Sequence, residues 1–340
     1  MQLTEKIHKT LFEEILAGKY SPGSRMPTEF ETAERFNACR VTVRRAYAIL
    51  EEDGVIVRKK RCGTIVSSNY IGSTSPITSI AAVMPLADNF ARVFLETLCK
   101  EAAKENILTI IEPDAGSGKT LSDTVSRLAS AGVRNMIIWA ADNFYDTELF
   151  RRLRVLGINL VFFDRIKPED LFADYVGLDN QHAVTLLVNE ALRRGVKHLI
   201  YGGAGDLDFY TNKERRKAFT DICRKNGISH EFIEFSREEA PSPQLLENCF
   251  QALQAHQGQA ALLCVNDAIA LKALPGVPEN TPVFSIDGTS EALERGIISI
   301  AQPMQEMAKQ CLAALNNQRA RGAKWNAKEY RLQGELQTKC

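Results

Sequence analysis

The chain has 340 residues, of which 45% are apolar and 25% charged, and its 42 basic and 42 acidic side chains give a formal net charge of zero. This length predicts two or three domains, and the composition is that of a globular protein rather than a disordered or membrane-embedded one. A neutral total also argues against a chain built mainly for polyanions or membrane surfaces, provided that the charge is evenly spread.

Export, membrane insertion and metal binding are not predicted. No stretch reaches the roughly 20 apolar residues of a transmembrane helix. The N-terminal residues, which include Glu5, Glu13 and Glu14, lack the basic and apolar regions of a signal peptide. The eight cysteines never form a Cys-x-x-Cys pair, and the five histidines have no metal-ligand spacing. We therefore expect a cytoplasmic protein with reduced thiols and without a metal or cofactor.

The first 66 residues alternate helical patterns with turns. Apolar residues recur every four positions from Leu3 to Ile15, which predicts a helix with one apolar face that ends before Gly18. Thr28 and Glu31 have the spacing of a capping box and open a second helix, which ends near residues 36–37. Only about three residues separate it from a third helix over residues 40–52. Two helices joined by so short a turn form a helix-turn-helix.

The third helix and the segment after it carry the basic residues. Val43, Ala46 and Leu50 have core spacing. The first turns of the opposite side carry Arg40, Val41, Arg44 and Arg45. Residues 55–66 then form two β-rich runs around four consecutive cations at 58–61, which predicts a hairpin with a basic tip. A recognition helix beside such a wing would contact DNA twice.

The local charge differs from the neutral total. Residues 1–70 hold 12 basic and 9 acidic side chains, a net of +3, and residues 38–61 hold 7 basic and 3 acidic, a net of +4. The remaining residues therefore sum to −3. A run of four cations alone more often forms a solvated face, but together with the helix-turn-helix pattern it favours DNA contact.

Residues 15–66 resemble the winged helix of GntR-type regulators. The resemblance rests on Ile15, Gly18, Pro22-Gly23, Met26-Pro27-Thr28-Glu29, Arg40-Val41-Thr42-Val43-Arg44, Leu50, Gly54 and Gly63-Thr64-Ile65-Val66. Cys39 replaces the serine that usually caps the recognition helix, and Arg61 replaces a wing-tip glycine. The resemblance implies double-stranded operator DNA as a partner, contacted by Glu29, Arg40, Thr42, Arg44, Arg45, Lys60, Arg61 and Gly63.

Residues 67–78 are small and polar and are predicted to form a linker. From residue 79 onward, apolar runs alternate with helical patterns such as those at 90–105, 121–131, 180–194 and 213–226. The runs are nearly all apolar, as strands buried on both faces should be, and lie at 80–85, 108–112, 135–140, 159–164, 175–178, 198–202, 261–265 and 282–286. Such β-α-β alternation predicts parallel sheets.

Motifs for catalysis are incomplete in this part of the chain. The Gly116-Ser117-Gly118-Lys119-Thr120 segment has proline at position 113, where a phosphate-binding loop needs glycine. The glycines at 202, 203 and 205 do not complete a dinucleotide-binding fingerprint, and there is no Gly-x-Ser-x-Gly. We predict no catalytic residue. An enzyme with an α/β catalytic domain behind a DNA-binding regulatory head, and an architectural DNA binder without a ligand, remain as alternatives.

Residues 78–335 resemble the LacI/GalR-type effector domain, which is related to periplasmic sugar-binding proteins. The resemblance rests on Phe163-Asp164-Arg165, Val176, Asp179-Asn180, Ala183, Gly195, His198-Leu199-Ile200, Arg215, Ala218-Phe219, Asn266-Asp267, Ala270 and Ile286-Asp287-Gly288. It implies two α/β subdomains that close over a small molecule, most simply a monosaccharide, held at the carboxyl ends of the strands. The candidate ligand-binding residues are Phe90, Arg92, Trp139, Asp164, Phe209, Thr211, Arg215, Asn266 and Asp287.

Several of these residues have a purely structural alternative. Asp164 and Asp287 suit strand-end caps, Arg215 suits an exposed helix surface, and Trp139 suits packing. Asp179 is expected to cap the following helix rather than to bind a ligand. For a polyol, carboxylates accept from hydroxyl groups, Arg and Asn donate, and an aromatic wall stacks on the sugar ring.

The sequence therefore predicts an α/β protein: a small winged helix-turn-helix domain at 1–66, a linker at 67–78, and a two-subdomain periplasmic-binding-protein-like α/β domain with parallel sheets at 79–340 for effector binding and dimerisation. We expect a ligand-responsive transcriptional regulator, a repressor in function, that binds its operator as a homodimer.

Overall fold

The computed structural model describes residues 2–67, 76–86, 89–113, 118–140, 146–165, 172–205, 209–236, 239–256 and 258–338. The chain divides into two compact units. The first comprises Met1–Phe163, Lys167–Val176 and Ala308–Tyr330, and the second comprises Asp164–Ile166, Gly177–Met307 and Arg331–Cys340. Most of the predicted linker and residues 114–117 of the glycine-containing loop lie outside the described residues.

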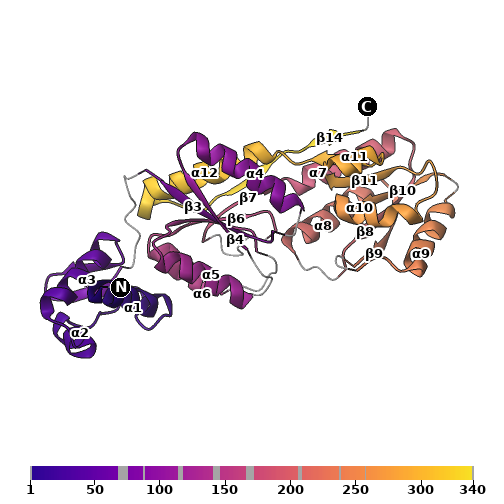
Figure 1. Ribbon diagram of the computed structural model, residues 1–340. Helices are drawn as coiled ribbons and strands as arrows, with labels where there is room; N and C mark the ends of the chain where they lie inside the picture. The colour runs from indigo at the N-terminus through magenta and orange to yellow at the C-terminus, as the bar shows by residue number, and fades with distance from the viewer. Residues whose placement is uncertain are drawn as a thin grey trace. The chain divides into compact units, whose positions relative to one another are not determined.

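The first 66 residues form the expected helices and hairpin, which we call the head (Figure 1). The helices are α1 (Leu3–Leu16), α2 (Glu29–Phe36) and α3 (Arg40–Glu52). Strands β1 (Ile56–Lys59) and β2 (Gly63–Val66) pair in antiparallel fashion. The apolar positions at four-residue spacing in α1, Ile7, Leu11 and Ile15, are buried against those of α3.

Local capping sets the helix boundaries in the head. The Thr28 hydroxyl accepts a hydrogen bond from the Glu31 backbone N–H, and the Glu31 carboxylate accepts one from the Thr28 N–H, as the capping box requires. Asn37 ends α2 in the left-handed region at φ 47°. Cys39 occupies the N-cap of α3 without making a side-chain cap, as expected of a thiol, and its Sγ lies 3.0 Å from the Thr42 hydroxyl instead.

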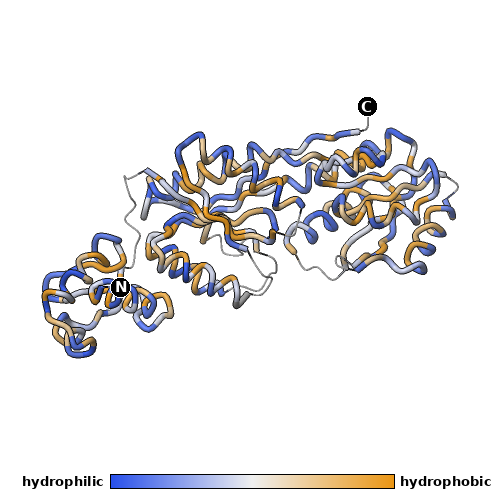
Figure 2. The backbone as a smooth tube through the Cα atoms, viewed as in Figure 1, coloured by the Kyte–Doolittle hydropathy of each residue, from blue (hydrophilic) through white to orange (hydrophobic). Residues whose placement is uncertain are grey.

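The remainder of the first unit is built on a six-stranded sheet in the order β13-β7-β6-β5-β3-β4. The five strands from β3 to β7 are parallel to their neighbours in the sheet. Hydrophobic residues are concentrated along them (Figure 2). Figure 1 shows α4 and α12 on one face of the sheet and α5 and α6 on the other. The bounds are β3 (Ser79–Met84), β4 (Leu108–Pro113), β5 (Asn135–Ile138), β6 (Asn159–Phe163), β7 (Asp174–Leu178), β13 (Glu329–Leu332), α4 (Asn89–Lys104), α5 (Gly118–Ser130), α6 (Thr147–Val155) and α12 (Met304–Arg321).

The second unit repeats this plan with a sheet in the order β14-β12-β11-β10-β8-β9. All of its strand pairs are parallel except β12 with β14. The bounds are β8 (His198–Gly203), β9 (Ser229–Glu234), β10 (Ala260–Cys264), β11 (Val283–Asp287), β12 (Ile298–Ala301), β14 (Glu335–Gln337), α7 (Asn180–Arg193), α8 (Tyr210–Lys225), α9 (Pro243–Gln254), α10 (Asp267–Ala273) and α11 (Ser290–Glu294). In the described part of the chain, every helix is too short or too polar to cross a bilayer.

One expectation about the elements is wrong in detail. The run at 108–112 was predicted to be buried on both faces but forms an edge strand, β4, in which Leu108, Ile110 and Ile111 are exposed. Strands β9, β13 and β14 escaped prediction because they mix polar with apolar residues, as edge positions allow. Strand β12 lies inside its sheet and escaped prediction because it is only four residues long.

The tip of the wing is strained. Arg61 adopts φ 69°, in the left-handed region that suits the glycine common at this position, and it lies two residues before Gly63 at φ 81°. A side chain in this region costs roughly 1–2 kcal/mol, whereas glycine adopts it freely but loses more chain entropy on folding.

We therefore expect Arg61→Gly to stabilise the protein by up to about 1 kcal/mol, the difference between relief of the left-handed strain and the entropy of glycine. Calorimetric or chemical unfolding of the full chain measures this change. Lys60→Gly is the matched control, because Lys60 is equally exposed but does not have a positive φ, and it should be destabilising. Destabilisation by both substitutions would contradict a strained tip.

Candidate functional site

The head presents its arginines to solvent. Arg40, Arg44 and Arg45 at the start of α3 are exposed, and so are Lys60 and Arg61 at the wing tip. A groove of about 530 Å³ runs between α3, the start of α2 and the wing. Of the eight predicted DNA contacts, four line this groove, namely Glu29, Arg40, Arg61 and Gly63, whereas Thr42, Arg44, Arg45 and Lys60 do not.

Glu29 organises the basic residues around it. Its carboxylate lies 3.2 Å from Arg44 Nε and 3.6 Å from Arg58 Nη2, and Arg58 Nε is also 3.3 Å from Glu51. A carboxylate repels phosphate, so its position between two arginines indicates that it orients them. Sequence reasoning missed Arg58, together with Arg25, Phe30 and Lys59, which also line the groove. The basic run at 58–61 contained this signal, but only its tip was selected.

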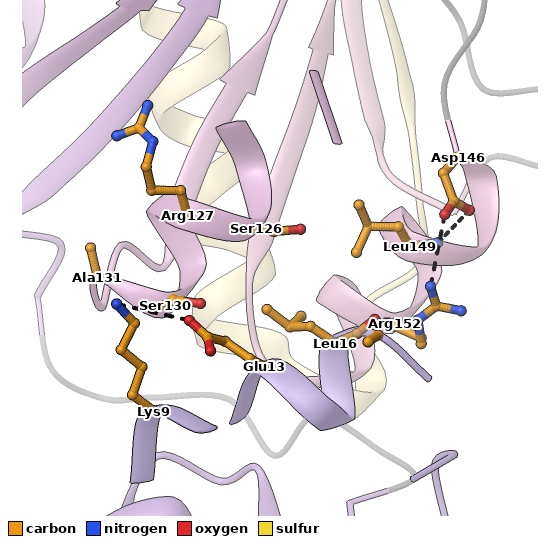
Figure 3. A pocket seen from close by; sticks show the side chains of 11 residues that line it. Lys9, Glu13, Leu16, Ser126, Arg127, Ser130, Ala131, Asp146, Leu149 and Arg152 are labelled. Carbon is orange, nitrogen blue, oxygen red and sulfur yellow. Dashed lines mark hydrogen bonds and ion pairs between the residues drawn. The ribbon is translucent and has the colours of Figure 1, made fainter. Parts of the chain in front are cut away.

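The head also contacts helices α5 and α6 of its own unit. Arg152 on α6 donates from Nε to the Leu16 carbonyl at the end of α1, at 2.9 Å. Arg134 donates to the Asp53 carboxylate, at 3.3 Å, and its guanidinium lies 5.5 Å from the Phe12 ring. Beside these contacts is a pocket of about 590 Å³ (Figure 3), lined by Lys9, Glu13, Leu16, Ala17, Ser126, Arg127, Ser130, Ala131, Asp146, Leu149 and Arg152.

Asp53 is ionised in this contact. Its partial burial alone would raise the pKa of the carboxyl group, but the hydrogen bond from His8 and the charge of Arg134 outweigh burial and hold the pKa of Asp53 below its usual value. The contact of the head with the rest of its unit therefore includes an ion pair between Asp53 and Arg134 and a hydrogen bond from Arg152 to the end of α1.

An aromatic cluster stands at the carboxyl ends of the strands in the first unit. The Phe90 ring centroid is 5.3 Å from that of Trp139 and 6.2 Å from that of Phe163, and Phe94 stacks on Phe163 at 3.8 Å. Phe90 and Trp139 are buried, whereas Arg92 is exposed and donates to Asn89 Oδ1 at 2.7 Å. The structure thus brings together two of the three predicted aromatic residues, Phe90 and Trp139, and Arg92 bonds to its own helix turn.

The second unit holds the predicted polar residues at the carboxyl ends of its strands. Arg215 is 4% exposed, so it is not a surface charge. It donates from Nε to Asn180 Oδ1 at 2.7 Å and from Nη1 to the Val265 carbonyl at 2.8 Å. Thr211 is buried one turn before it on the same helix. The Arg165 guanidinium lies 5.0 Å from the ring of buried Phe209.

Asparagine and aspartate residues after the strands have distinct tasks. Asn266 caps α10, because its Oδ1 accepts from the Ile269 N–H at 2.9 Å, a role that sequence reasoning had not assigned to it. Asp179 caps α7 through the His182 N–H at 3.0 Å, as predicted. Helix α10 ends after seven residues, before Pro275. Asp164 and Asp287 have positive φ values of 54° and 139°. Such strained backbone is common where side chains are aimed at a ligand.

Asp267 is a buried hub that the sequence did not single out. Its two carboxylate oxygens accept hydrogen bonds from Ser285, from Ser299 at 2.7 Å, and from the N–H and hydroxyl of Thr289 at 2.7 and 2.8 Å. The Ser299 hydroxyl in turn accepts from the Gly288 N–H at 2.9 Å. The segment that carries Asp287 is therefore fixed from both sides.

Asp287 has few polar neighbours by comparison. Gln302 Nε2 donates to its carboxylate at 2.9 Å. Loss of water around it, followed by the negative charge of Asp267, raises the pKa of Asp287 well above the usual value of a carboxyl group, although Arg215 acts in the opposite direction. A carboxylate held with so little compensation is better suited to a ligand than to the fold.

The glycine run after β8 is a packing feature. A Cβ atom on Gly202 would come within 2.9 Å of the Cys264 Sγ, and one on Gly203 would come within 2.9 Å of a Glu234 carboxylate oxygen. Close contact with β10 and β9 therefore explains these glycines without a bound nucleotide.

Comparison with known proteins agrees with the geometry of the head. Residues 3–66 match the model of the bacterial regulatory proteins of the gntR family. The head is a GntR-type helix-turn-helix domain. Over 221 residues the chain is 26% identical to the HTH-type transcriptional regulator Rv3575c of Mycobacterium tuberculosis. This alignment covers 55% of the chain and 58% of that protein, so the chain spans less than two thirds of this relative.

Similarity extends over both units in another relative. The arabinose metabolism transcriptional repressor of Geobacillus stearothermophilus is 21% identical over 318 residues, which cover 88% of this chain and 86% of the repressor. A solved periplasmic binding protein/LacI transcriptional regulator from Alkaliphilus metalliredigens, complexed with D-xylulofuranose, superposes with a TM-score of 0.61 at 16% identity. It covers 76% of this chain and 97% of its own. The GntR-type head is thus followed by a periplasmic-binding-protein-like fold.

We expect Asp287→Asn to stabilise the protein at neutral pH. Because the pKa of Asp287 is raised on folding, the folded state binds this proton more tightly, and stability falls as the pH rises from the usual carboxyl range toward the raised value. Each unit by which folding raises the pKa of Asp287 lowers the free energy of unfolding at neutral pH by about 1.4 kcal/mol. The Asp287→Asn variant has no ionisable group there, so its stability is not lowered in this way. Urea unfolding at pH 7 and near pH 4 measures the gain, which should vanish at the lower pH.

Asp267→Asn is the matched control for this prediction. It replaces an oxygen that accepts hydrogen bonds with an N–H₂ donor and leaves buried hydroxyl groups unsatisfied, so it should destabilise by about 3 kcal/mol or more at neutral pH. Equal destabilisation by both substitutions would show that Asp287 is also structural.

Proposed function

We propose that this protein is a transcriptional repressor that binds operator DNA through its GntR-type head and is controlled by a small molecule, a monosaccharide, bound by its periplasmic-binding-protein-like part. One observation supports this most: a winged helix with an exposed row of arginines shares one chain with a two-sheet fold that has buried polar side chains at the carboxyl ends of the strands. The named relatives are transcriptional regulators, which favours a regulator over an enzyme. We propose a cytoplasmic location, because a repressor must reach its operator.

The contacts with DNA follow from exposure and charge. Helix α3 enters the major groove, with Arg40, Arg44 and Arg45 reaching guanine edges and phosphates. Thr42 is partly exposed on the same helix, and Val41, which is 58% exposed, offers an apolar contact to a thymine methyl group. Lys60, Arg61 and Gly63 bring the wing to the neighbouring backbone. Glu29 orients Arg44 rather than touching phosphate.

We propose a homodimer because the structure leaves an apolar edge uncovered. Leu108 is 74% exposed on edge strand β4, and Ile110, Ile111 and Val93 beside it are exposed as well. An edge strand with apolar side chains is a template for pairing with another chain. Two heads would then read half-sites about 34–36 Å apart on a palindromic operator.

The proposed sugar site uses the polar residues of the second unit. Asp164, Asn266 and Asp287 accept from sugar hydroxyl groups, and the buried guanidinium of Arg215 donates to them. Phe209 and Thr211 would contact the same ligand. From the first unit, Phe90 and Trp139 are proposed to stack on the apolar face of the ring, and Arg92 is proposed as a further donor.

The contact of the head with α5 and α6 provides a route for control. Arg152 on α6 bonds to the end of α1, and Arg134, between α5 and β5, bonds to Asp53. We propose that the sugar-bound and sugar-free conformations differ in these contacts, and that the ligand acts because it binds the two conformations with different affinity. The linker at 67–78 would carry the remainder of the signal.

Arg44→Ala is expected to weaken operator binding by about 1–3 kcal/mol and to reduce its dependence on salt, because one cation of the recognition helix is lost. Fluorescence anisotropy with labelled operator at several salt concentrations measures both, and sedimentation of the complex should show two chains per operator. Arg224→Ala removes an exposed arginine from α8 and is the matched control, with no expected change. Unchanged affinity in Arg44→Ala would exclude the recognition helix.

A screen of pentoses, hexoses, uronic acids and nucleosides tests the effector. A specific ligand at a hundredfold excess over its Kd should stabilise the protein by about 2.7 kcal/mol and change its operator affinity. Asp287→Asn should lose the ligand response and keep operator binding, whereas Glu291→Gln, on exposed α11, should keep both. If no ligand shifts either property, the protein is a DNA binder without an effector. Turnover of a ligand would instead support the alternative of an enzyme with a regulatory head.

A further inference from the structure

The second unit contains a histidine cluster that neither the proposed DNA contacts nor the proposed sugar site uses. His198 begins β8, Glu231 lies on β9, and His256 follows α9. One donor atom of each of these three side chains lies within 4.8 Å of the donor atoms of the other two. Linear spacing did not predict a site here, because the three residues come from three separate segments.

The cluster lies at the amino ends of the strands, and the proposed sugar site lies at their carboxyl ends. His198 is the first residue of its strand and pairs in register with Ala260, the first residue of β10. Asn266 and Asp287 instead follow or end their strands. Because the strands are parallel, all their amino ends lie on one side of the sheet and all their carboxyl ends lie on the other. The histidines and the proposed sugar site are therefore on opposite sides.

His198 is unsatisfied in the described part of the chain. It is 6% exposed, and neither ring nitrogen makes a hydrogen bond there. Its Nε2 lies 3.4 Å from a Glu231 carboxylate oxygen, which is within ion-pair distance but outside hydrogen-bond geometry. A buried polar group left in this way usually has an ion or water as its partner.

The distances and the ring chemistry suit a transition metal. Two ligand atoms of a tetrahedral zinc ion with bonds of about 2.0–2.1 Å lie about 3.4 Å apart, which is the separation between His198 Nε2 and the Glu231 oxygen. The His256 ring stacks on His198 with centroids 3.6 Å apart, and it has room to turn because it is partly exposed.

We propose that His198, Glu231 and His256 bind one divalent transition-metal ion of the Zn²⁺ class, with a water molecule as a fourth ligand. Imidazole and carboxylate ligands favour Zn²⁺ and its neighbours over Mg²⁺ or Ca²⁺. Bound there, the ion ties the turn between α9 and β10 to the start of β8 and to β9. His230 does not take part, because its ring packs against Phe219 and Phe232 and its Nδ1 lies 3.2 Å from the Ile228 carbonyl.

Zinc titration of the full chain tests this proposal. The purified protein is stripped with EDTA, kept under reducing conditions, and titrated with Zn²⁺ in competition with a chromophoric chelator. We expect one tight equivalent per chain and a higher melting temperature with the metal. His256→Ala and Glu231→Gln alter partly or fully exposed side chains, so both should fold, and each should weaken zinc binding by more than about tenfold.

Two controls separate this site from other ligands on the chain. His182→Ala removes a partly exposed histidine from α7 and should bind zinc as the unaltered protein does. Co²⁺ in place of Zn²⁺ should show no thiolate charge-transfer band, which excludes binding at the exposed Cys39 and Cys62. Absence of tight binding, a thiolate band, or undiminished binding by both site variants would overturn the proposal.

Discussion

The buried carboxylate of Asp267 holds the part of the molecule on which the proposed ligand site depends. It is 1% exposed and accepts hydrogen bonds from side chains on β11 and β12 and from the Thr289 backbone. Buried charge is tolerated only where such bonds replace water. Because these bonds fix the residues on either side of Asp287, the latter can adopt φ 139° and remain weakly compensated. One carboxylate maintains the fold, and its neighbour is left available for a ligand.

In the head, too, one carboxylate positions other side chains, and the side chains that it positions are the proposed contacts with DNA. Glu29 lies between Arg44 and Arg58 and keeps both guanidinium groups beside the groove. Exposed ion pairs of this kind contribute little to stability, so their value is in orientation. Fewer acidic than basic groups stand on α3 and the wing, and phosphate can therefore replace the internal partners of the arginines. The neutral charge of the whole chain is the sum of a cationic head and an anionic remainder.

In each sheet the carboxyl ends of the strands carry candidate ligand-binding residues, which is where parallel sheets generally bind ligands. In the second sheet the amino ends of the strands are also chemically distinctive, because His256 and Glu231 lie beside the buried imidazole of His198 there. A metal ion there would stiffen the amino ends of the strands whose carboxyl ends hold Asn266 and Asp287. The sugar and the metal would then act on one sheet from two sides, without sharing a residue.

Local features of this protein could be predicted from its sequence. The α3 bounds, the capping box at Thr28 and Glu31, the wing, and most strands of the two parallel sheets follow from periodicity and short-range hydrogen bonds. Both family resemblances rest on such local motifs. Three other features became visible in the folded chain alone. Arg215 is buried, β4 is an edge strand, and the side chains of His198, Glu231 and His256 lie together. Burial, edge position and side-chain clustering depend on which distant segments pack together, and a period of two or four residues does not contain that information.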